Sequence, residues 1–171
     1  SCGSRVMELL YCYECGDVSL GGYSDWIDGG LGEEEYLSSS SPNAPEKNPQ
    51  LVFKRGRRDY RWFWPSAGRT PRETASFAAG TRNFTFTKAS LDPRTGRVDV
   101  GHQDPELVEG WVVQPKKQLT PEEARTIVIP ALPDRCPACD QRGRAAGQDK
   151  EKFERGEVRT PIRAHTAGAS R

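Results

Sequence analysis

Two short stretches near opposite ends of the chain, LLYCYECGD (residues 9–17) and LPDRCPACD (residues 132–140), decide how it folds. In each, two residues separate a pair of cysteines, the spacing with which one tight turn, here called a knuckle, presents two thiolates to a metal ion. Four thiolates complete the tetrahedral shell of a structural Zn²⁺ ion. We therefore predict one zinc site made by both ends of the chain, with the ligands Cys12, Cys15, Cys136 and Cys139.

The residue that follows each knuckle fits this prediction. Gly16 follows the first cysteine pair, and a glycine permits the positive φ that lets backbone N–H groups point at the sulfurs. Asp140 follows the second pair, and aspartate is one of the few other residues that adopt left-handed backbone. We expect the two knuckles to have the same geometry.

The pairing of the knuckles rests on their type, because residues 16–135 lie between them and zinc ribbons usually separate their pairs by about 15–20 residues. The alternative is that each pair is a separate thiol couple, but neither lies in the βαβ context of redox motifs. A site closed by four thiolates has no open position for a substrate, so the expected metal is structural. The fifth cysteine, Cys2, lies among small flexible residues and is expected to be a spectator rather than a replaceable ligand.

The composition limits the classes of protein that are possible. The chain has 171 residues, 35% of them hydrophobic and 29% charged, so we expect one domain with a modest core. Its net charge of +1 gives no overall preference for nucleic acid or membranes. There is no apolar run that would span a membrane and no secretory signal, and the cysteine pattern fits a reducing compartment, so we expect a cytoplasmic protein.

The pattern of apolar residues and turns predicts a mainly β fold with little helix. We expect a strand, a knuckle and a strand over residues 4–20, and two strands over residues 51–65. Residues 83–100 have the strongest hairpin pattern, with a turn at Asp92–Gly96, and a further strand is expected over residues 107–114.

One short helix is predicted after these strands. Thr120 is a suitable N-cap, Pro121 suits the first helical position, and the helix should end by Pro130. The expected fold is therefore a set of antiparallel strands packed on a four-cysteine zinc ribbon formed by the two ends of the chain.

We interpret residues 1–171 as a single zinc-binding domain. Residues 25–120 are expected to form an insertion between the two knuckles. Within it, residues 29–50 are rich in Ser, Pro, Gly and Glu, which is typical of a mobile surface loop. Residues 141–171 are expected to form a basic tail.

Cations and aromatic residues are mixed in residues 54–64, a combination that can contact phosphates and stack on bases. A further arginine lies in the C-terminal tail. The candidate nucleic-acid contacts are Lys54, Arg55, Arg57, Arg58, Arg61, Trp62, Trp64 and Arg163. The alternative is that Phe53 and the two tryptophans belong to the core while the cations face solvent.

No catalytic motif is present in the sequence. The two histidines, His102 and His165, are not next to a serine or cysteine in a nucleophile motif, and there is no glycine-rich phosphate loop. The acidic run Glu33–Glu35 is expected at the surface. We do not expect this chain alone to be an enzyme.

Three stretches of the chain resemble the C-terminal, Mrr-like zinc-binding region of large bacterial DEAD/DEAH-type helicases of DNA repair and anti-phage defence. They are LLYCYECGDVSLGG (residues 9–22), LPDRCPAC (residues 132–139) and PIRAHTAG (residues 161–168). In that family, two RecA-like domains hydrolyse ATP, but their motifs G-x-x-x-x-G-K-[ST] and D-E-x-H are missing here. The resemblance implies a non-catalytic domain that braces such a motor near its DNA.

The resemblance implies DNA and the remainder of a helicase polypeptide or complex as partners, with no membrane. Two alternatives stay open from the sequence. The first is a protein-interaction module that docks a partner subunit. The second is an accessory domain of a nuclease or modification enzyme.

Overall fold

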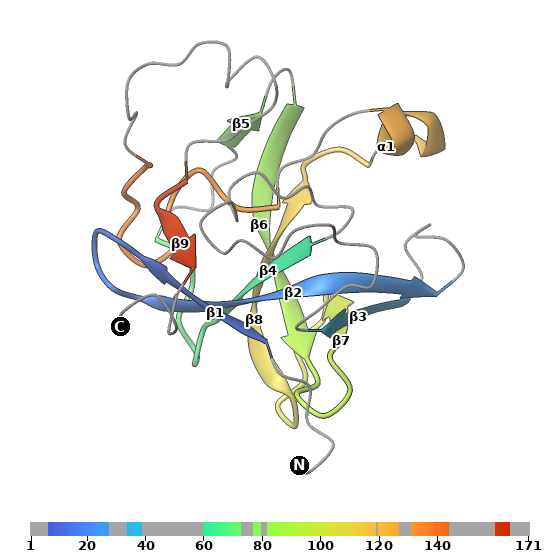
Figure 1. Ribbon diagram of the computed structural model, residues 1–171, viewed down its shortest axis with the longest axis horizontal. Helices are drawn as coiled ribbons and strands as arrows, with labels where there is room; N and C mark the ends of the chain where they lie inside the picture. Colours follow the sequence, from blue (N-terminus) through green and yellow to red (C-terminus); the bar gives the residue numbers. More distant parts are fainter. Residues whose placement is uncertain are drawn as a thin grey trace, which may run out of the picture.

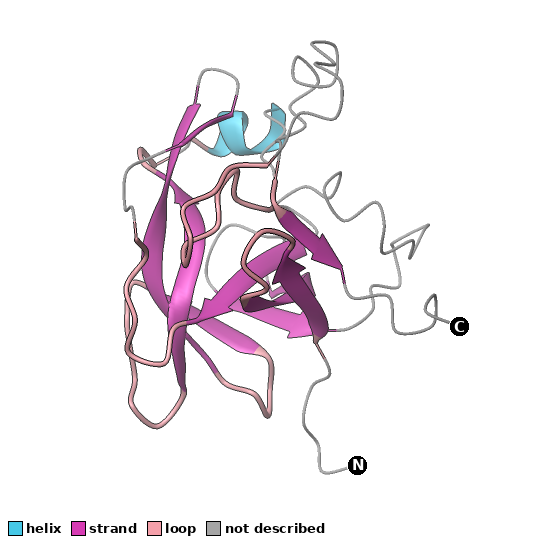
Figure 2. Cartoon of the chain, turned by 90° about the vertical axis from the view of Figure 1, so that its left-hand side faces the viewer, coloured by secondary structure: helices cyan, strands magenta, loops and turns pink. Residues whose placement is uncertain are grey.

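The computed structural model describes residues 7–27, 34–38, 60–72, 77–79, 82–118, 120–126, 131–143 and 160–164. These residues form nine strands and one helix. The strands are β1 (Glu8–Cys12), β2 (Val18–Ile27), β3 (Glu34–Ser38), β4 (Tyr60–Pro65), β5 (Phe77–Ala79), β6 (Arg82–Leu91), β7 (Arg97–Val100), β8 (Val108–Pro115) and β9 (Ile162–Ala164). The helix is α1 (Pro121–Thr126), which lies at one end of the molecule (Figure 2).

The strands form a closed antiparallel β-barrel (Figure 1). Its strands follow the order β3, β7, β6, β8, β4 and β2, and β2 pairs with β3 to close the ring. Closure is possible because β2 is long: its first half pairs with β1 and its second half pairs with β3. A closed barrel leaves no unpaired edge within the ring.

The side chains of β4 alternate between two hydrophobic clusters. Phe63 belongs to a cluster whose members come from all six strands of the ring, so this cluster is the barrel interior. Trp62 and Trp64 belong to a second cluster that also contains Leu132 and Ile162, which lie outside the barrel strands. The second cluster is therefore the outer aromatic face of the barrel, and the segments that carry the second knuckle and β9 cover it.

Two glycines let the aromatic residues of β4 lie against neighbouring strands. A Cβ on Gly21 would overlap the ring and hydroxyl of Tyr60. A Cβ on Gly110 would overlap the ring of Phe63 and the carbonyl oxygen of Trp64. Because β4 lies between β2 and β8 in the barrel, each glycine gives space on one side of it.

Most of the predicted elements are confirmed. The first knuckle connects two strands, the hairpin of residues 83–100 is β6 and β7, and β8 corresponds to the strand expected over residues 107–114. Helix α1 begins as predicted, since the Thr120 hydroxyl accepts a hydrogen bond from the Glu123 amide at 3.2 Å. The Glu123 carboxylate accepts one from the Thr120 amide at 3.4 Å, which completes a capping box.

Two expectations about the organisation of the chain need correction, and a third can be described in more detail. The loop expected at residues 29–50 contains β3, in which Glu35 and Leu37 are buried between β2 and β7. Part of the expected basic tail, residues 141–171, forms β9 and pairs with β1. Residues 25–120, expected as an insertion between the two knuckles, include β3, β4, β6, β7 and β8, so this part of the chain supplies five of the six strands of the ring. Residues 51–59, where a strand and a turn were expected, lie outside the described residues.

Candidate metal centre

The first knuckle is a tight turn between β1 and β2. The Cys12 amide donates a hydrogen bond to the Asp17 carbonyl at 3.0 Å, and the Gly16 amide donates to the Cys12 carbonyl at 2.8 Å. Gly16 has a φ of 80°, as expected for the residue after the second cysteine. The Asp17 amide then lies 3.4 Å from the Cys15 sulfur and donates a hydrogen bond to it.

The second knuckle repeats this geometry at the other end of the chain. The Cys136 amide donates to the Gln141 carbonyl at 3.0 Å, and the Asp140 amide donates to the Cys136 carbonyl at 2.9 Å. Asp140 has a φ of 60°, so it occupies the left-handed position that Gly16 occupies in the first knuckle. The prediction from the local sequence is confirmed.

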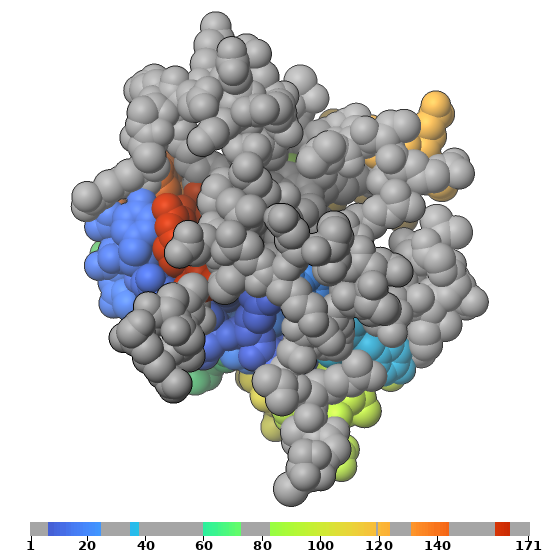
Figure 3. Space-filling view, viewed as in Figure 1, coloured from blue at the N-terminus to red at the C-terminus, as the bar shows by residue number. Residues whose placement is uncertain are grey.

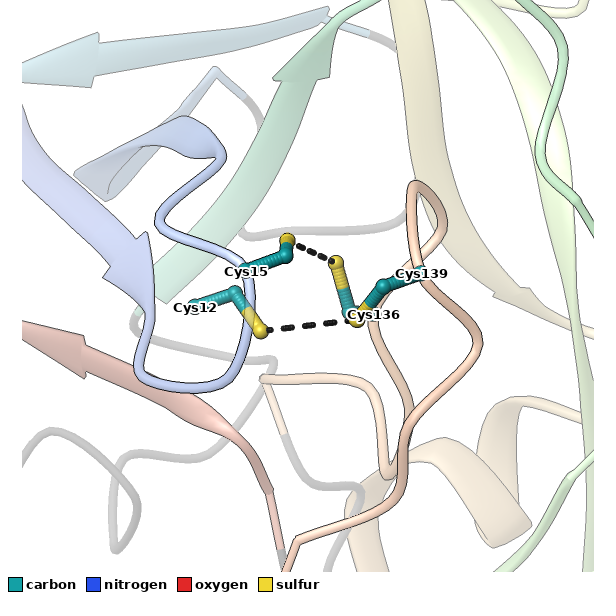
Figure 4. A group of neighbouring side chains, drawn as sticks. All are labelled: Cys12, Cys15, Cys136 and Cys139. Carbon is teal, nitrogen blue, oxygen red and sulfur yellow. Dashed lines mark hydrogen bonds between the residues drawn. The ribbon is translucent and has the colours of Figure 1, made fainter.

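The two knuckles face each other, and their sulfurs form one group (Figure 4). The Cys12 and Cys139 sulfurs are 3.8 Å apart, the Cys15 and Cys136 sulfurs are 3.7 Å apart, and all four lie within 4.8 Å of one another. A disulfide would need about 2.05 Å. For a tetrahedral ion with metal–sulfur bonds of about 2.3 Å, neighbouring sulfurs lie about 3.8 Å apart. The four cysteines thus fit one metal ion, and the two pairs lie together as one group.

Backbone pairing with β9 holds the first knuckle in place. β9 pairs with β1, so that Ile162 lies opposite Cys12, and the Tyr13 amide donates a hydrogen bond to the Pro161 carbonyl at 3.1 Å. Figure 3 shows β9, in red, beside the blue segments of the first strands on one face of the molecule. The second knuckle is held by burial of Leu132 and Cys136 in the outer aromatic face.

The environment of the thiols differs from one cysteine to another. Burial raises the pKa of Cys136 and of Cys139. At Cys15, partial burial pushes the pKa upward, but hydrogen bonds from the Asp17 amide and from the neighbouring thiols outweigh it and lower the pKa. A metal ion that enters this group must therefore displace protons from the buried thiols.

Three of the candidate nucleic-acid contacts belong to the core instead. Trp62 and Trp64 are each 1% exposed, in the outer aromatic face. Arg61 is 2% exposed, and its guanidinium forms a 2.7 Å ion pair with the buried Glu35 carboxylate. These three side chains have no surface to offer to a nucleic acid, and the core alternative holds for the two tryptophans.

The other candidates differ in how the structure places them. Lys54, Arg55, Arg57 and Arg58 lie outside the described residues, as do Cys2 and His165. Arg163 is half-buried beside the first knuckle, where its guanidinium lies 4.8 Å from the centre of the Tyr13 ring and donates to the Thr160 carbonyl at 2.6 Å.

Among the residues that the structure describes, no helix has the length and apolar character needed to span a membrane.

A search of curated proteins and a search of solved structures each found no match for the chain. Residues 1–160 match the family model described as the YjiV N-terminal domain. Because this match extends over most of the chain, the protein belongs to the YjiV N-terminal domain family.

Proposed function

We propose that this chain is a non-catalytic structural domain whose four cysteines hold one Zn²⁺ ion, and that it braces the motor of a DNA helicase or translocase. The observation that carries the metal part of the proposal is the distance of 3.7–3.8 Å between sulfurs from opposite ends of the chain. Such a site would link both ends of the chain to one face of the barrel. Its shell is complete without a substrate, so the ion supplies stability rather than chemistry.

The ligand set favours zinc over other metals. Four thiolates suit zinc or iron. Zinc has no redox chemistry, so it fits a site whose role is structural. Free thiols at these distances also support a reducing compartment such as the cytoplasm. Elemental analysis of the purified chain should give one zinc per chain, whereas stoichiometric iron would refute the assignment of the metal.

The helicase part of the proposal rests on how three stretches of sequence come together. Residues 9–22, 132–139 and 161–168 are the parts that resemble the helicase zinc-binding region. Their described residues contain the first knuckle, the second knuckle and β9, which are neighbours around the cysteine group. Distant parts of the sequence that carry one resemblance and form one site support the idea of a shared module. The family is described as an N-terminal domain, whereas the resemblance is to a C-terminal region, so the support for this part of the proposal comes from the three stretches alone.

DNA contact is the part of this proposal that the isolated chain can test. Arg163 lies beside the first knuckle, and Lys54, Arg55, Arg57 and Arg58 supply further cations. Binding of a single-stranded oligonucleotide to the zinc-loaded chain should weaken with salt, by about 0.7 in log affinity per log salt for each phosphate contacted. Arg163→Ala should weaken binding and lower this slope by about one contact. Arg94→Ala, an exposed arginine in the β6–β7 turn, is the control. Equal binding by both variants would remove Arg163 from the proposed contact.

A second candidate function is docking of a partner protein, which two exposed apolar side chains favour. Leu9 on β1 and Val18 on β2 are 46% and 44% exposed, and β1 pairs with β2. An apolar docking surface would bind with little dependence on salt, unlike a phosphate-binding surface. An accessory role in a nuclease would instead require Mg²⁺-dependent cleavage in the complete complex, and we expect none from this chain alone.

A further inference from the structure

The loop of residues 66–72, which follows β4, contacts both knuckles of the metal centre. On one side, the Arg69 guanidinium pairs with the Asp17 carboxylate, with Nη1–Oδ1 and Nη2–Oδ2 distances of 3.1 and 3.5 Å. On the other side, the Arg72 amide donates a hydrogen bond to the Pro137 carbonyl at 2.7 Å. One loop of the barrel is therefore attached to the turn that carries each cysteine pair.

This 66–72 loop is itself held in one conformation by the barrel. The Ser66 amide donates to the Glu109 carbonyl of β8 at 3.1 Å, and the Arg69 amide donates to the Ser66 carbonyl at 2.9 Å. The Trp111 indole donates to the Arg69 carbonyl at 3.2 Å. These contacts fix the backbone of Arg69, from which its side chain projects, relative to β8.

Asp17 joins this loop to the metal ligands. Its carbonyl accepts the Cys12 amide, and its own amide donates to the Cys15 sulfur, so its backbone lies in direct contact with both cysteines of the first knuckle. Its carboxylate accepts a hydrogen bond from the Trp64 indole at 2.5 Å as well as those from Arg69. The Trp64 indole and the Arg69 guanidinium thus hold the side chain of the residue whose backbone contacts Cys12 and Cys15.

The ion pair itself is too exposed to be explained as a source of stability. The Arg69 and Asp17 side chains are 49% and 23% exposed, and such surface pairs add little to folding. Its geometry is nevertheless fixed, because the guanidinium makes two contacts with the carboxylate and lies 4.7 Å from the centre of the Trp64 ring. Hydrogen-bonded partners of this kind orient metal ligands.

We infer that the 66–72 loop positions both knuckles for the metal, with Arg69 and Asp17 as positioning residues that slow the loss of the ion. The inference rests on the proposed zinc site and adds to it the part of the barrel that sets its geometry. The loop attaches to the knuckles by a side-chain pair on one side and a backbone hydrogen bond on the other. The side-chain pair is the part that substitution can remove.

The test compares variants of the zinc-loaded chain in the presence of an excess of a coloured chelator. Arg69→Ala should release zinc about 10-fold faster than the wild type, in line with the effect of removing partners of metal ligands. Arg69→Lys keeps the charge but loses the planar fork, so it should recover part of the difference. Arg94→Ala is the matched control, since Arg94 also pairs with an aspartate, Asp92, in the β6–β7 turn.

Cobalt gives a second measurement, which separates positioning from general stability. In the Co²⁺-substituted chain, the visible bands of the thiolate-bound ion should shift in Arg69→Ala and stay unchanged in Arg94→Ala. Asp17→Asn removes the charge that pairs with Arg69, while the amide oxygen of asparagine still accepts a hydrogen bond from the Trp64 indole. It should therefore release zinc faster and shift the cobalt bands, as Arg69→Ala does. This second variant keeps the inference testable if Arg69→Ala folds poorly.

The possible failures are distinguishable. A wild-type chain that binds no metal would refute the proposed zinc site itself. A wild type that holds zinc, with Arg69→Ala and Asp17→Asn matching Arg94→Ala in release rate and cobalt spectrum, would refute only the positioning role.

Discussion

Gly16 and Asp140 occupy equivalent left-handed positions in the two knuckles, with φ values of 80° and 60°. The position thus accepts two residue types for different reasons. Glycine has no Cβ to strain, and aspartate tolerates this backbone better than most residues. At Asp140 the carboxylate also lies 3.4 Å from the Arg135 guanidinium, which anchors the second knuckle.

Substitution of Gly16 should show the cost of this backbone conformation alone. A Cβ at this position would meet no atom within 4 Å, so a loss of stability in Gly16→Ala comes from the positive φ and not from a clash. We expect Gly16→Ala to lower the free energy of unfolding by about 1–2 kcal/mol and Gly16→Asn to lower it less. Urea unfolding of the zinc-loaded chain measures both, and equal losses for Ala and Asn would contradict the explanation.

The buried Arg61–Glu35 pair inside the barrel makes a different prediction. Both side chains are almost fully buried, and the Ser24 hydroxyl donates to the second carboxylate oxygen at 2.6 Å. Glu35→Leu alone should destabilise the chain by about 3–5 kcal/mol, because it leaves the guanidinium buried without its anion. The double variant Arg61→Leu with Glu35→Leu should recover much of this loss. A double-mutant cycle by urea unfolding checks it, and additive losses would argue against the pair.

At the scale of elements, local patterns could be predicted and pairings between distant strands could not. The knuckles, the β6–β7 hairpin and the capping box depend on neighbouring residues, so their sequence signals suffice. The barrel closes through β2 and β3, and β3 lies in a polar segment; within the strand itself, Leu37 is the buried aliphatic residue. A pattern of that kind indicates a loop as readily as a strand.

The candidate site shows the same limit. The ligands could be found because C-x-x-C spacing is specific, whereas the mixture of cations and aromatics around Trp62 fits a surface as well as a core. Asp17 lies two residues after Cys15, and a carboxylate so close to the first knuckle was a usable signal. No such signal marked Arg69, because only the folded barrel brings its Nη1 atom to within 3.1 Å of the Asp17 Oδ1 atom.

The two knuckles also predict how metal binding depends on pH. Burial raises the pKa of Cys136 and Cys139, so in the metal-free chain these thiols stay protonated at neutral pH and a metal must displace their protons. Zinc affinity should therefore increase as the pH rises and fall as the solution is acidified. Competition with a chelator of known affinity at several pH values measures this, with proton release followed by calorimetry in different buffers. A pH-independent affinity would rule out thiol ligands.

At the scale of the whole molecule, the metal centre connects parts of the chain that are far apart in sequence. The sulfur pairs join residues separated by 127 and 121 positions. Apparent binding free energies of structural zinc sites are on the order of 10 kcal/mol, comparable with the whole stability of a small domain. The barrel has its own interior cluster, so loss of the ion should release the knuckles first from the outer aromatic face.

The most direct measurement is zinc content together with thermal unfolding, for the wild type, Cys136→Ser and the control Cys2→Ser, each with and without a chelator. We expect one zinc per chain in the wild type and in Cys2→Ser, with a marked fall in Tm when the chelator is added. Cys136→Ser should hold little zinc and unfold at the lower temperature from the start. A wild type without bound metal, or a Cys136→Ser variant that binds zinc and unfolds like the wild type, would contradict the claim that the two ends of the chain share one ion.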